Sequence, residues 1–140
     1  MGLLKLDYDC SKKDMMSLLY KGLVSMRRVH DSKMSCPIIV KAMYAARTTH
    51  GYHIKLSYCD NILLYDATMQ KIIEPDIRNY ILHLQSLFGS DRTRGFFDAR
   101  RVYHKEKIFN MLFDYKNGQQ FSEDKQTKNE VNKLIRDVLK

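Results

Sequence analysis

The first residues of this 140-residue chain alternate strictly between apolar and polar side chains, and this pattern favours a fold built on a β-sheet. In a strand, successive side chains point to opposite faces. One face of the segment 3–9 therefore holds Leu4, Leu6 and Tyr8, and the other holds Lys5, Asp7 and Asp9. Alternate positions lie about 6.5–7 Å apart, which lets two carboxylates close on one cation or a cation pair. The same acids also suit a solvated strand end, so both interpretations stay open here.

A second extended region follows between residues 38 and 58. Residues 41–47 and 52–58 are typical of strands, and the polar segment Thr48-Thr49-His50-Gly51 predicts a turn between them. The second strand places His53, Lys55 and Ser57 on one face. Cationic and hydroxyl groups beside a glycine-containing turn suit a phosphate, although His53 is equally explained as a half-exposed sheet histidine.

Three segments have helical character. A capping box at residues 11–14 and the stripe Met15, Leu18 and Leu19 predict a short helix that ends at Gly22, with a possible strand over 23–30. Residues 74–76 predict the start of a core helix that ends at Gly89. A capping box from Thr127 to Glu130 predicts a C-terminal amphipathic helix that packs on the sheet rather than on a partner.

A third acidic residue lies in a later apolar and basic segment. Asp98 follows Phe96-Phe97 and precedes Arg100 and Arg101. An acid in such a strand costs free energy unless it is paired or binds a cation. Either arginine can supply the pairing, so a salt bridge and a metal ligand both explain Asp98. Beyond it, Asn117-Gly118 predicts a hairpin between 109–116 and 119–121.

Composition limits the class of protein. The length suits a single domain over residues 1–140, and the mixture of helices and strands predicts an α+β fold with an antiparallel-rich sheet and helices on one face. Three isolated cysteines indicate reduced thiols rather than a disulfide framework or a zinc knuckle. Without a long apolar run or a signal peptide, we expect an intracellular, cytoplasmic protein that does not bind membranes.

The charge favours a polyanionic partner. Lysine and arginine number 24 against 16 acids, a net charge of +8. In a chain this small, such an excess is typical of proteins that bind nucleic acid or nucleotide phosphate, although a merely basic soluble protein also fits. Three carboxylates can hold two divalent ions, and two ions can bind a triphosphate and activate a hydroxyl for in-line attack. The pattern therefore indicates nucleotidyl transfer.

These motifs resemble those of the archaeo-eukaryotic primase (primase-polymerase) superfamily, in particular the small primase-like replication proteins of archaeal viruses and plasmids. Leu4-Lys5-Leu6-Asp7-Tyr8-Asp9 is similar to the first motif of the family. Gly51-Tyr52-His53 is similar to the second, a small residue and a histidine entering a strand, and Phe97-Asp98 with the arginines after it is similar to the third. The resemblance extends in order from Leu3 to about Lys116.

The resemblance implies a catalytic core related to the RNA-recognition-motif (RRM) fold and a DNA primase activity in replication. It implies a two-metal site with Mg²⁺ or Mn²⁺ held by Asp7, Asp9 and Asp98, and nucleotide phosphate bound by His53. Arg47, Thr49 and Arg101 are implied as contacts to phosphate or template. Single-stranded DNA template and nucleoside triphosphates are the expected partners. A further replication subunit is also expected, because the chain is short, has no zinc motif and need not be active alone.

Two other classes of function compete with this interpretation. A non-catalytic RRM-like module would use the basic charge and stack bases on Phe96, Phe97 and Tyr52, but the chain has no recognisable aromatic RNP signature. A replication initiator with a tyrosine nucleophile would need a His-apolar-His metal site. His50 and His53 are three positions apart, so this class ranks third.

Overall fold

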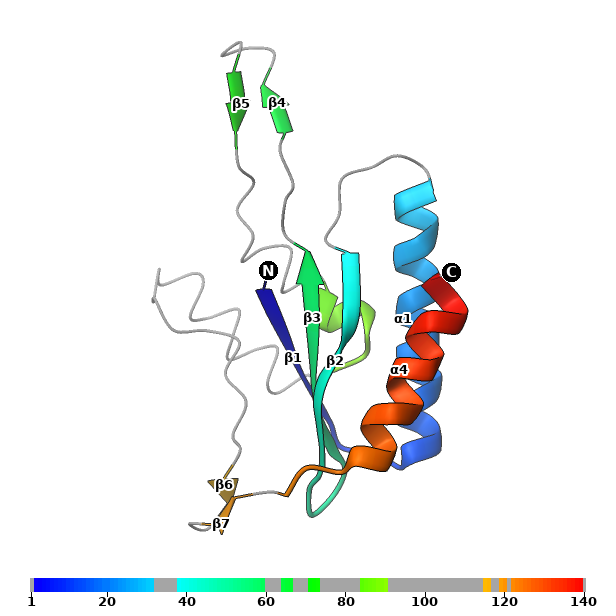
Figure 1. The fold of residues 1–140 in the computed structure, drawn as a ribbon, viewed down its shortest axis with the longest axis vertical. Coiled ribbons are helices and arrows are strands. Elements are labelled where there is room, and N and C mark those ends of the chain that lie inside the picture. Colours follow the sequence, from blue (N-terminus) through cyan, green and yellow to red (C-terminus); the bar gives the residue numbers. More distant parts are fainter. Residues whose placement is uncertain are drawn as a thin grey trace.

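A three-stranded antiparallel sheet carries two long helices on one face (Figure 1). The computed structural model describes residues 2–31, 38–59, 64–66, 71–73, 84–90, 115–116, 119–120 and 122–139. The strands are β1 (Gly2–Tyr8), β2 (Ile38–Arg47) and β3 (Tyr52–Cys59), in the order β1-β3-β2. The helices are α1 (Lys12–Asp31) and α4 (Lys125–Leu139). The predicted α+β class with an antiparallel sheet and helices on one face is confirmed.

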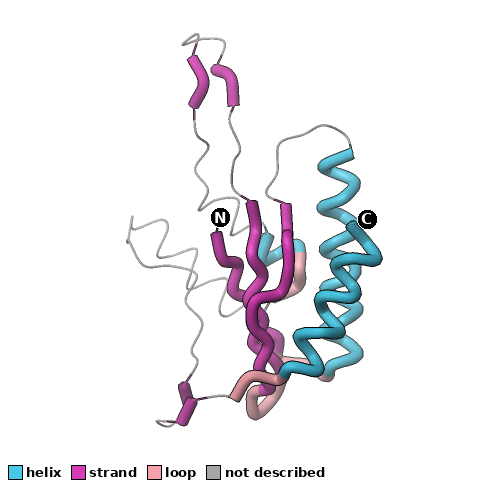
Figure 2. Tube along the Cα trace, in the orientation of Figure 1, coloured by secondary structure: helices cyan, strands magenta, loops and turns pink. Residues whose placement is uncertain are grey.

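The hydrophobic core lies between the sheet and these two helices (Figure 2). The predicted apolar face of β1 is correct, because Leu4, Leu6 and Tyr8 are all buried. β3 contributes the alternate residues Tyr52, Ile54, Leu56 and Tyr58, also buried. β2 buries Ile39, Ala42 and Ala45, and its register against β3 shifts twice, between Ile39 and Lys41 and between Ala42 and Tyr44. Its other large apolar residues, Ile38, Val40 and Met43, are exposed.

Helix α1 is longer than the sequence predicts. It starts as expected after Ser11, whose hydroxyl accepts a hydrogen bond from the Asp14 N–H at 3.2 Å. However, Gly22 does not end it, and the strand predicted over residues 23–30 is wrong. Leu23 and Met26 continue the buried stripe of Met15 and Leu19 at helical spacing. Gly22 instead leaves room for the Phe88 ring, which a Cβ at this position would overlap.

The segment Leu84–Ser90 closes the core beside β1. Residues 84–87 form one helical turn, and Gly89, with a φ of 69°, ends it as predicted. The Ser90 N–H donates to the Gln85 carbonyl at 3.0 Å and the Gly89 N–H to the Ser86 carbonyl at 3.1 Å, a Schellman arrangement. The first part of the predicted helix, residues 74–83, lies outside the described residues.

Helix α4 packs its apolar face on the sheet and on α1, as predicted, with Val131, Ile135 and Val138 buried. Its start differs from the prediction, since Lys125 is the first helical residue and Asp124 is the cap. Asp124 accepts hydrogen bonds from the Thr127 N–H at 3.1 Å and from the Thr127 hydroxyl at 2.8 Å. These bonds hold the pKa of Asp124 below its usual value. Thr127 is therefore a buried residue of the first turn and not the cap.

Side chains occupy the outer backbone groups of both edge strands. On β2, the Ala42 N–H donates to Asn132 Oδ1 at 2.8 Å, and Asn132 Nδ2 donates to the Ala42 carbonyl at 3.3 Å. On β1, the Asp7 N–H donates to Ser90 Oγ at 3.0 Å, and this hydroxyl lies 3.3 Å from the Asp7 carbonyl. These contacts satisfy the outer backbone groups of Ala42 and Asp7.

Two small hairpins lie beyond the main sheet. β4 (Leu64–Asp66) pairs with β5 (Lys71–Ile73), and β6 (Tyr115–Lys116) pairs with β7 (Gln119–Gln120). The second pair confirms the hairpin predicted around residues 117–118. In the part of the chain that the structure describes, no helix is long and apolar enough to cross a membrane.

Candidate functional site

Asp7 and His53 are direct neighbours across the sheet. The antiparallel register of β1 and β3 pairs Asp7 with His53, Lys5 with Lys55 and Leu3 with Ser57. Directly opposite residues share a face, so these side chains lie on the sheet face that α1 and α4 do not cover, called the open face below, although His53 and Ser57 are buried there. His53 Nε2 lies 3.3 Å from Asp7 Oδ1. The structure thus brings together an acid of the first predicted motif and the histidine of the second.

The hydrogen-bond pattern of β1 explains this proximity. The N–H and carbonyl of Asp7 point outward to Ser90, so Asp7 and His53 form a pair without backbone hydrogen bonds between them. In such pairs the Cα atoms are closer, about 4.5 Å apart, and the side chains approach each other more nearly. The Asp7 side chain keeps 29% of its surface exposed against 9% for His53. The carboxylate is therefore open to a ligand, while the imidazole is held behind it.

The segment Leu84–Ser90 holds Asp7 in place from two directions. The Ser90 hydroxyl binds its backbone from the sheet edge. From the core, the hydroxyl of the next residue, Tyr8, donates to the Phe88 carbonyl at 2.7 Å, and burial raises the pKa of this tyrosine well above its usual value. Gln85 Nε2 also lies 3.5 Å from the Lys5 carbonyl. The sequence motifs contain no sign of this support, because it comes from a segment about 80 positions away.

The other predicted acids have different outcomes. Asp9 is exposed and follows the last residue of β1, so the strand that places Asp7 does not extend to it. Asp98 and Arg101 lie outside the described residues, as do Phe96, Phe97 and Arg100. Within the described ranges, no group of three or more His, Cys, Asp or Glu side chains is arranged to hold a metal ion. A carboxylate and an imidazole are nevertheless both ligands for Mn²⁺, and exposed carboxylates suit Mg²⁺.

The turn between β2 and β3 uses its own backbone groups. The Thr48 N–H donates to the Gly51 carbonyl at 2.8 Å, and the Gly51 N–H donates to the Thr48 hydroxyl at 3.0 Å. These two N–H groups are therefore satisfied within the turn and are not free to bind a phosphate. Gly51 is buried against the end of β1, where a Cβ would overlap the Tyr8 carbonyl. The close contact with Tyr8 is therefore sufficient to explain the glycine of the second motif.

Lys55 and Ser57, predicted to face phosphate beside His53, make contacts within the sheet. Lys55 Nζ lies 4.7 Å above the Tyr44 ring, which is a cation–π distance. The buried Ser57 hydroxyl donates to the Lys41 carbonyl at 3.1 Å. Both residues therefore have structural contacts on this face, and His53 contacts the carboxylate of Asp7.

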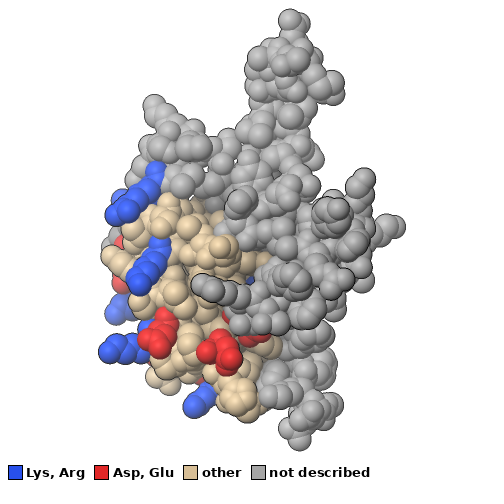
Figure 3. Space-filling model, turned by 180° about the vertical axis from the view of Figure 1, so that it is seen from behind, with Lys and Arg blue, Asp and Glu red and all other residues tan. Residues whose placement is uncertain are grey.

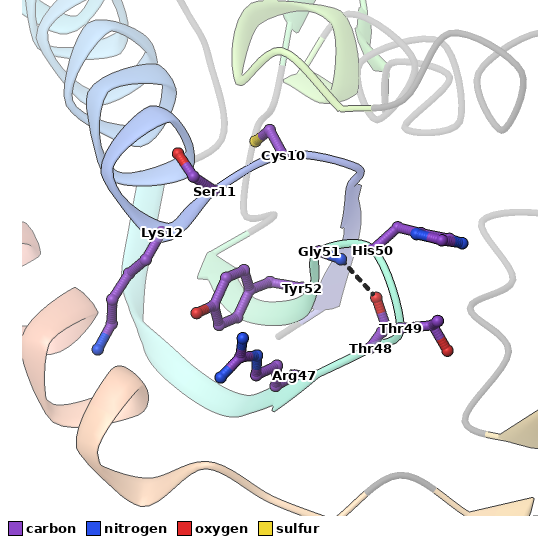
Figure 4. Close-up of a pocket in the computed structure, with 9 residues that line it drawn as sticks. All are labelled: Cys10, Ser11, Lys12, Arg47, Thr48, Thr49, His50, Gly51 and Tyr52. Carbon is purple, nitrogen blue, oxygen red and sulfur yellow. Dashed lines mark hydrogen bonds between the residues drawn. The ribbon is translucent and has the colours of Figure 1, made fainter.

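A polar hollow of about 580 Å³ lies at the end of the sheet (Figure 4). It is lined by residues 10–12, which lead into α1, and by residues 47–52, which include the turn. The predicted contacts Arg47 and Thr49 both line this hollow, whereas Asp7 and His53 do not. Sequence patterns did not identify Lys12 as part of a site. Tyr52 was expected to stack on bases in the alternative binding module, but its ring is buried in the core.

Cys10 in the hollow is not an activated nucleophile. Partial burial raises the pKa of its thiol, and the carboxylates of Asp14 and Asp9 raise it further. A reactive cysteine requires the opposite shift, toward the thiolate.

Surface charge in the described part of the molecule is mixed. On the face seen in Figure 3, Asp and Glu side chains gather toward the lower end, and Lys and Arg side chains lie mainly along the left margin.

No protein-family model, no curated protein and no solved structure matches this chain.

Proposed function

We propose that this protein is a primase-like nucleotidyltransferase that adds nucleotides to a strand on a single-stranded DNA template, with divalent metal ions. The observation that carries the proposal is the contact of Asp7 with His53 at 3.3 Å on the open face of the sheet. This contact joins two residue types that metal-dependent phosphoryl chemistry uses, a carboxylate for cations and an imidazole for phosphate.

The donor set supports Mg²⁺ or Mn²⁺ as the cofactor. Asp7 and Asp9 would hold the metal together with Asp98 of the third motif. When bound, the ions would neutralise the triphosphate and lower the pKa of the attacking hydroxyl. Asp7 would act from a fixed position, because Ser90 and Tyr8 hold the strand on either side of it. His53 would contact nucleotide phosphate from beneath the carboxylate, with Arg47, Thr49 and Arg101 as further contacts to phosphate or template.

The decisive experiment measures templated extension with Mn²⁺ and nucleoside triphosphates in matched variants. Asp7→Asn keeps the size of the side chain but removes its charge, and Asp9→Asn and Asp98→Ala test the other ligands. We expect each to reduce strand synthesis at least about 100-fold and the two Asn variants to weaken Mn²⁺ binding. Asp14→Asn, which changes an exposed acid on α1, is the matched control and should behave as the wild type.

A non-catalytic RRM-like nucleic-acid-binding module is the second candidate. The net charge of +8 and the engagement of Lys55 and Ser57 within the sheet favour it. Nucleic-acid binding that is independent of metal, together with no synthesis by the wild type alone or with a replication partner, would establish this candidate and reject the enzyme.

A further inference from the structure

The hollow at the end of the sheet opens on a different side from the Asp7–His53 pair. Tyr52 and His53 are successive residues of β3, so their side chains point to opposite faces. Tyr52 belongs to the helix-covered face and lines the hollow, whereas His53 meets Asp7 on the open face. The hollow is therefore a second place where this molecule can bind a ligand.

Among the residues that the structure describes, the lining of the hollow carries positive charge and no acid. Lys12, Arg47 and the imidazole of His50 line the hollow, and none of the nine lining residues is Asp or Glu. Lys12 is already balanced, because its Nζ lies 3.1 Å from Glu130 Oε2. Arg47 is exposed, and in the described part of the chain its guanidinium has no hydrogen bond or ion pair. The uncompensated charge of the hollow is thus that of Arg47.

A tyrosine hydroxyl faces the same space. Tyr52 is only 8% exposed, because its ring packs in the core, yet its hydroxyl forms no hydrogen bond to any residue that the structure describes. Figure 4 shows this hydroxyl and the Arg47 guanidinium on the same side of the hollow, with Lys12 beyond them, while His50 and Thr49 project the other way. The ring is buried, but the hydroxyl oxygen itself reaches the surface of the hollow and is available there as a donor. An acceptor in the hollow would satisfy both Tyr52 and Arg47.

The ligand that suits these groups is a phosphate. An arginine fork and a hydroxyl donor match tetrahedral oxyanions, and the absence of a carboxylate in the lining favours an anion over a cation. The phosphate of a nucleotide held by His53 would lie on the opposite face. A phosphate in the hollow therefore belongs to a second molecule, and for a strand-synthesising protein that molecule is the strand itself.

We propose that the hollow binds a backbone phosphate of single-stranded nucleic acid through Arg47 and the Tyr52 hydroxyl. The identity of the ligand as a strand rests on the proposed function, but the presence of a phosphate site does not. The site holds the strand at the end of the sheet while the open face remains free for the nucleotide.

The test measures binding of a fluorescently labelled single-stranded oligodeoxynucleotide by anisotropy, without metal or nucleotide and over a series of salt concentrations. Arg47→Ala should weaken binding about ten-fold and reduce the slope of log K against log[salt] by about 0.7, the value for one phosphate on a single strand. Tyr52→Phe keeps the ring in the core and should weaken binding about three-fold or more without changing the slope.

The matched control is Arg28→Ala. Arg28 is exposed and lies sixteen positions after Lys12 on α1, about 24 Å away along the helix axis. Binding by this variant should stay close to that of the wild type. An equal loss in Arg28→Ala and Arg47→Ala would show that only overall charge matters and would overturn the proposal, as would unchanged binding in Tyr52→Phe.

Two further measurements distinguish a nucleotide from a strand as the source of the phosphate, and distinguish the phosphate site from the proposed enzyme activity. If Arg47→Ala weakens binding of a nucleoside triphosphate but not of the oligonucleotide, the hollow holds the nucleotide and the strand proposal is wrong. Asp7→Asn should bind the oligonucleotide as the wild type does. Arg47-dependent strand binding in a protein without nucleotidyl transfer would reject the proposed enzyme and leave the phosphate site standing.

Discussion

The two faces of the central sheet use the same strands for different purposes. On the helix-covered face, Leu6 and Ile54 are fully buried in one continuous core. On the open face, the adjacent residues along the two strands are Asp7 and His53, a polar pair whose carboxylate is partly exposed. The helix-covered face therefore contributes most of the hydrophobic stabilisation. The other face can hold polar functional side chains with little loss of stability. Alternation along β1 and β3 keeps the two roles independent.

The largest expected loss of stability comes from a substitution on the helix-covered face. Leu6→Ala removes a fully buried side chain and should lower the free energy of unfolding by about 2–5 kcal/mol, because a cavity remains. Urea denaturation measures this loss. The matched variant Lys5→Ala, one position earlier and on the other face, should change stability by only about 0.5 kcal/mol or less. Similar losses in both variants would contradict the division between the faces.

Gly51→Ala should disturb both faces together. The added Cβ would overlap the Tyr8 carbonyl, so the end of β1 has to move relative to β3. We expect a loss of about 1–3 kcal/mol in stability and, because Asp7 precedes Tyr8, a loss of nucleotidyl transfer as well. Thr49→Ala, in the exposed part of the same turn, should leave the stability near that of the wild type. A stable Gly51→Ala protein would show that β1 and the turn are not in close contact.

Asp124→Ala should destabilise α4 and leave the open face of the sheet unchanged. Loss of the cap of α4 should cost about 1 kcal/mol at neutral pH. The pKa of Asp124 is lowered in the folded protein, so its contribution is present above the unfolded pKa of about 3.9 and is lost as the pH falls through the folded value. Denaturation at pH 7 and below pH 3 should therefore show the difference between variant and wild type shrinking in acid. Asp124→Asn keeps a capping oxygen and should lose less stability than Asp124→Ala. A stability difference between Asp124→Ala and the wild type that does not change with pH would contradict the assignment of the Asp124 carboxylate as the cap.

Asp7→Asn should have the smallest effect on stability. The pair with His53 lies at a partly exposed position, where such contacts contribute about 1 kcal/mol or less. A double-mutant cycle with His53→Gln measures this coupling directly. A loss comparable to that of Leu6→Ala would mean that the open face also holds the fold together.

Sequence patterns predicted the parts of this fold that depend on periodicity. The faces of β1 and β3, the apolar stripe of α4 and the end of the segment at Gly89 all follow from local spacing. Gly22 was misread because its role is to admit Phe88, a residue 66 positions later in the chain, and no local signal reports such a contact. The cap of α4 was misplaced for a similar reason: two competing side chains, Asp124 and Thr127, both resemble caps, and only the folded chain selects one.

The candidate site was also predictable only where it depends on local sequence patterns. The motif spacing indicated Asp7 and His53, but their direct contact depends on the register between β1 and β3, which alternation alone does not determine. The support from Ser90 and the hollow at Tyr52 and Arg47 arise where segments distant in sequence meet. Asp98, on which the third motif depends, lies outside the residues described.

The Asn132 and Ser90 side chains at the two sheet edges have a consequence for how this protein associates. Unoccupied edge strands invite pairing with further chains and are a common origin of aggregates. Here an incoming strand would first have to displace the Asn132 amide from Ala42 or the Ser90 hydroxyl from Asp7. Copies of the chain that meet in solution would therefore come into contact through their side-chain surfaces before their sheets could join.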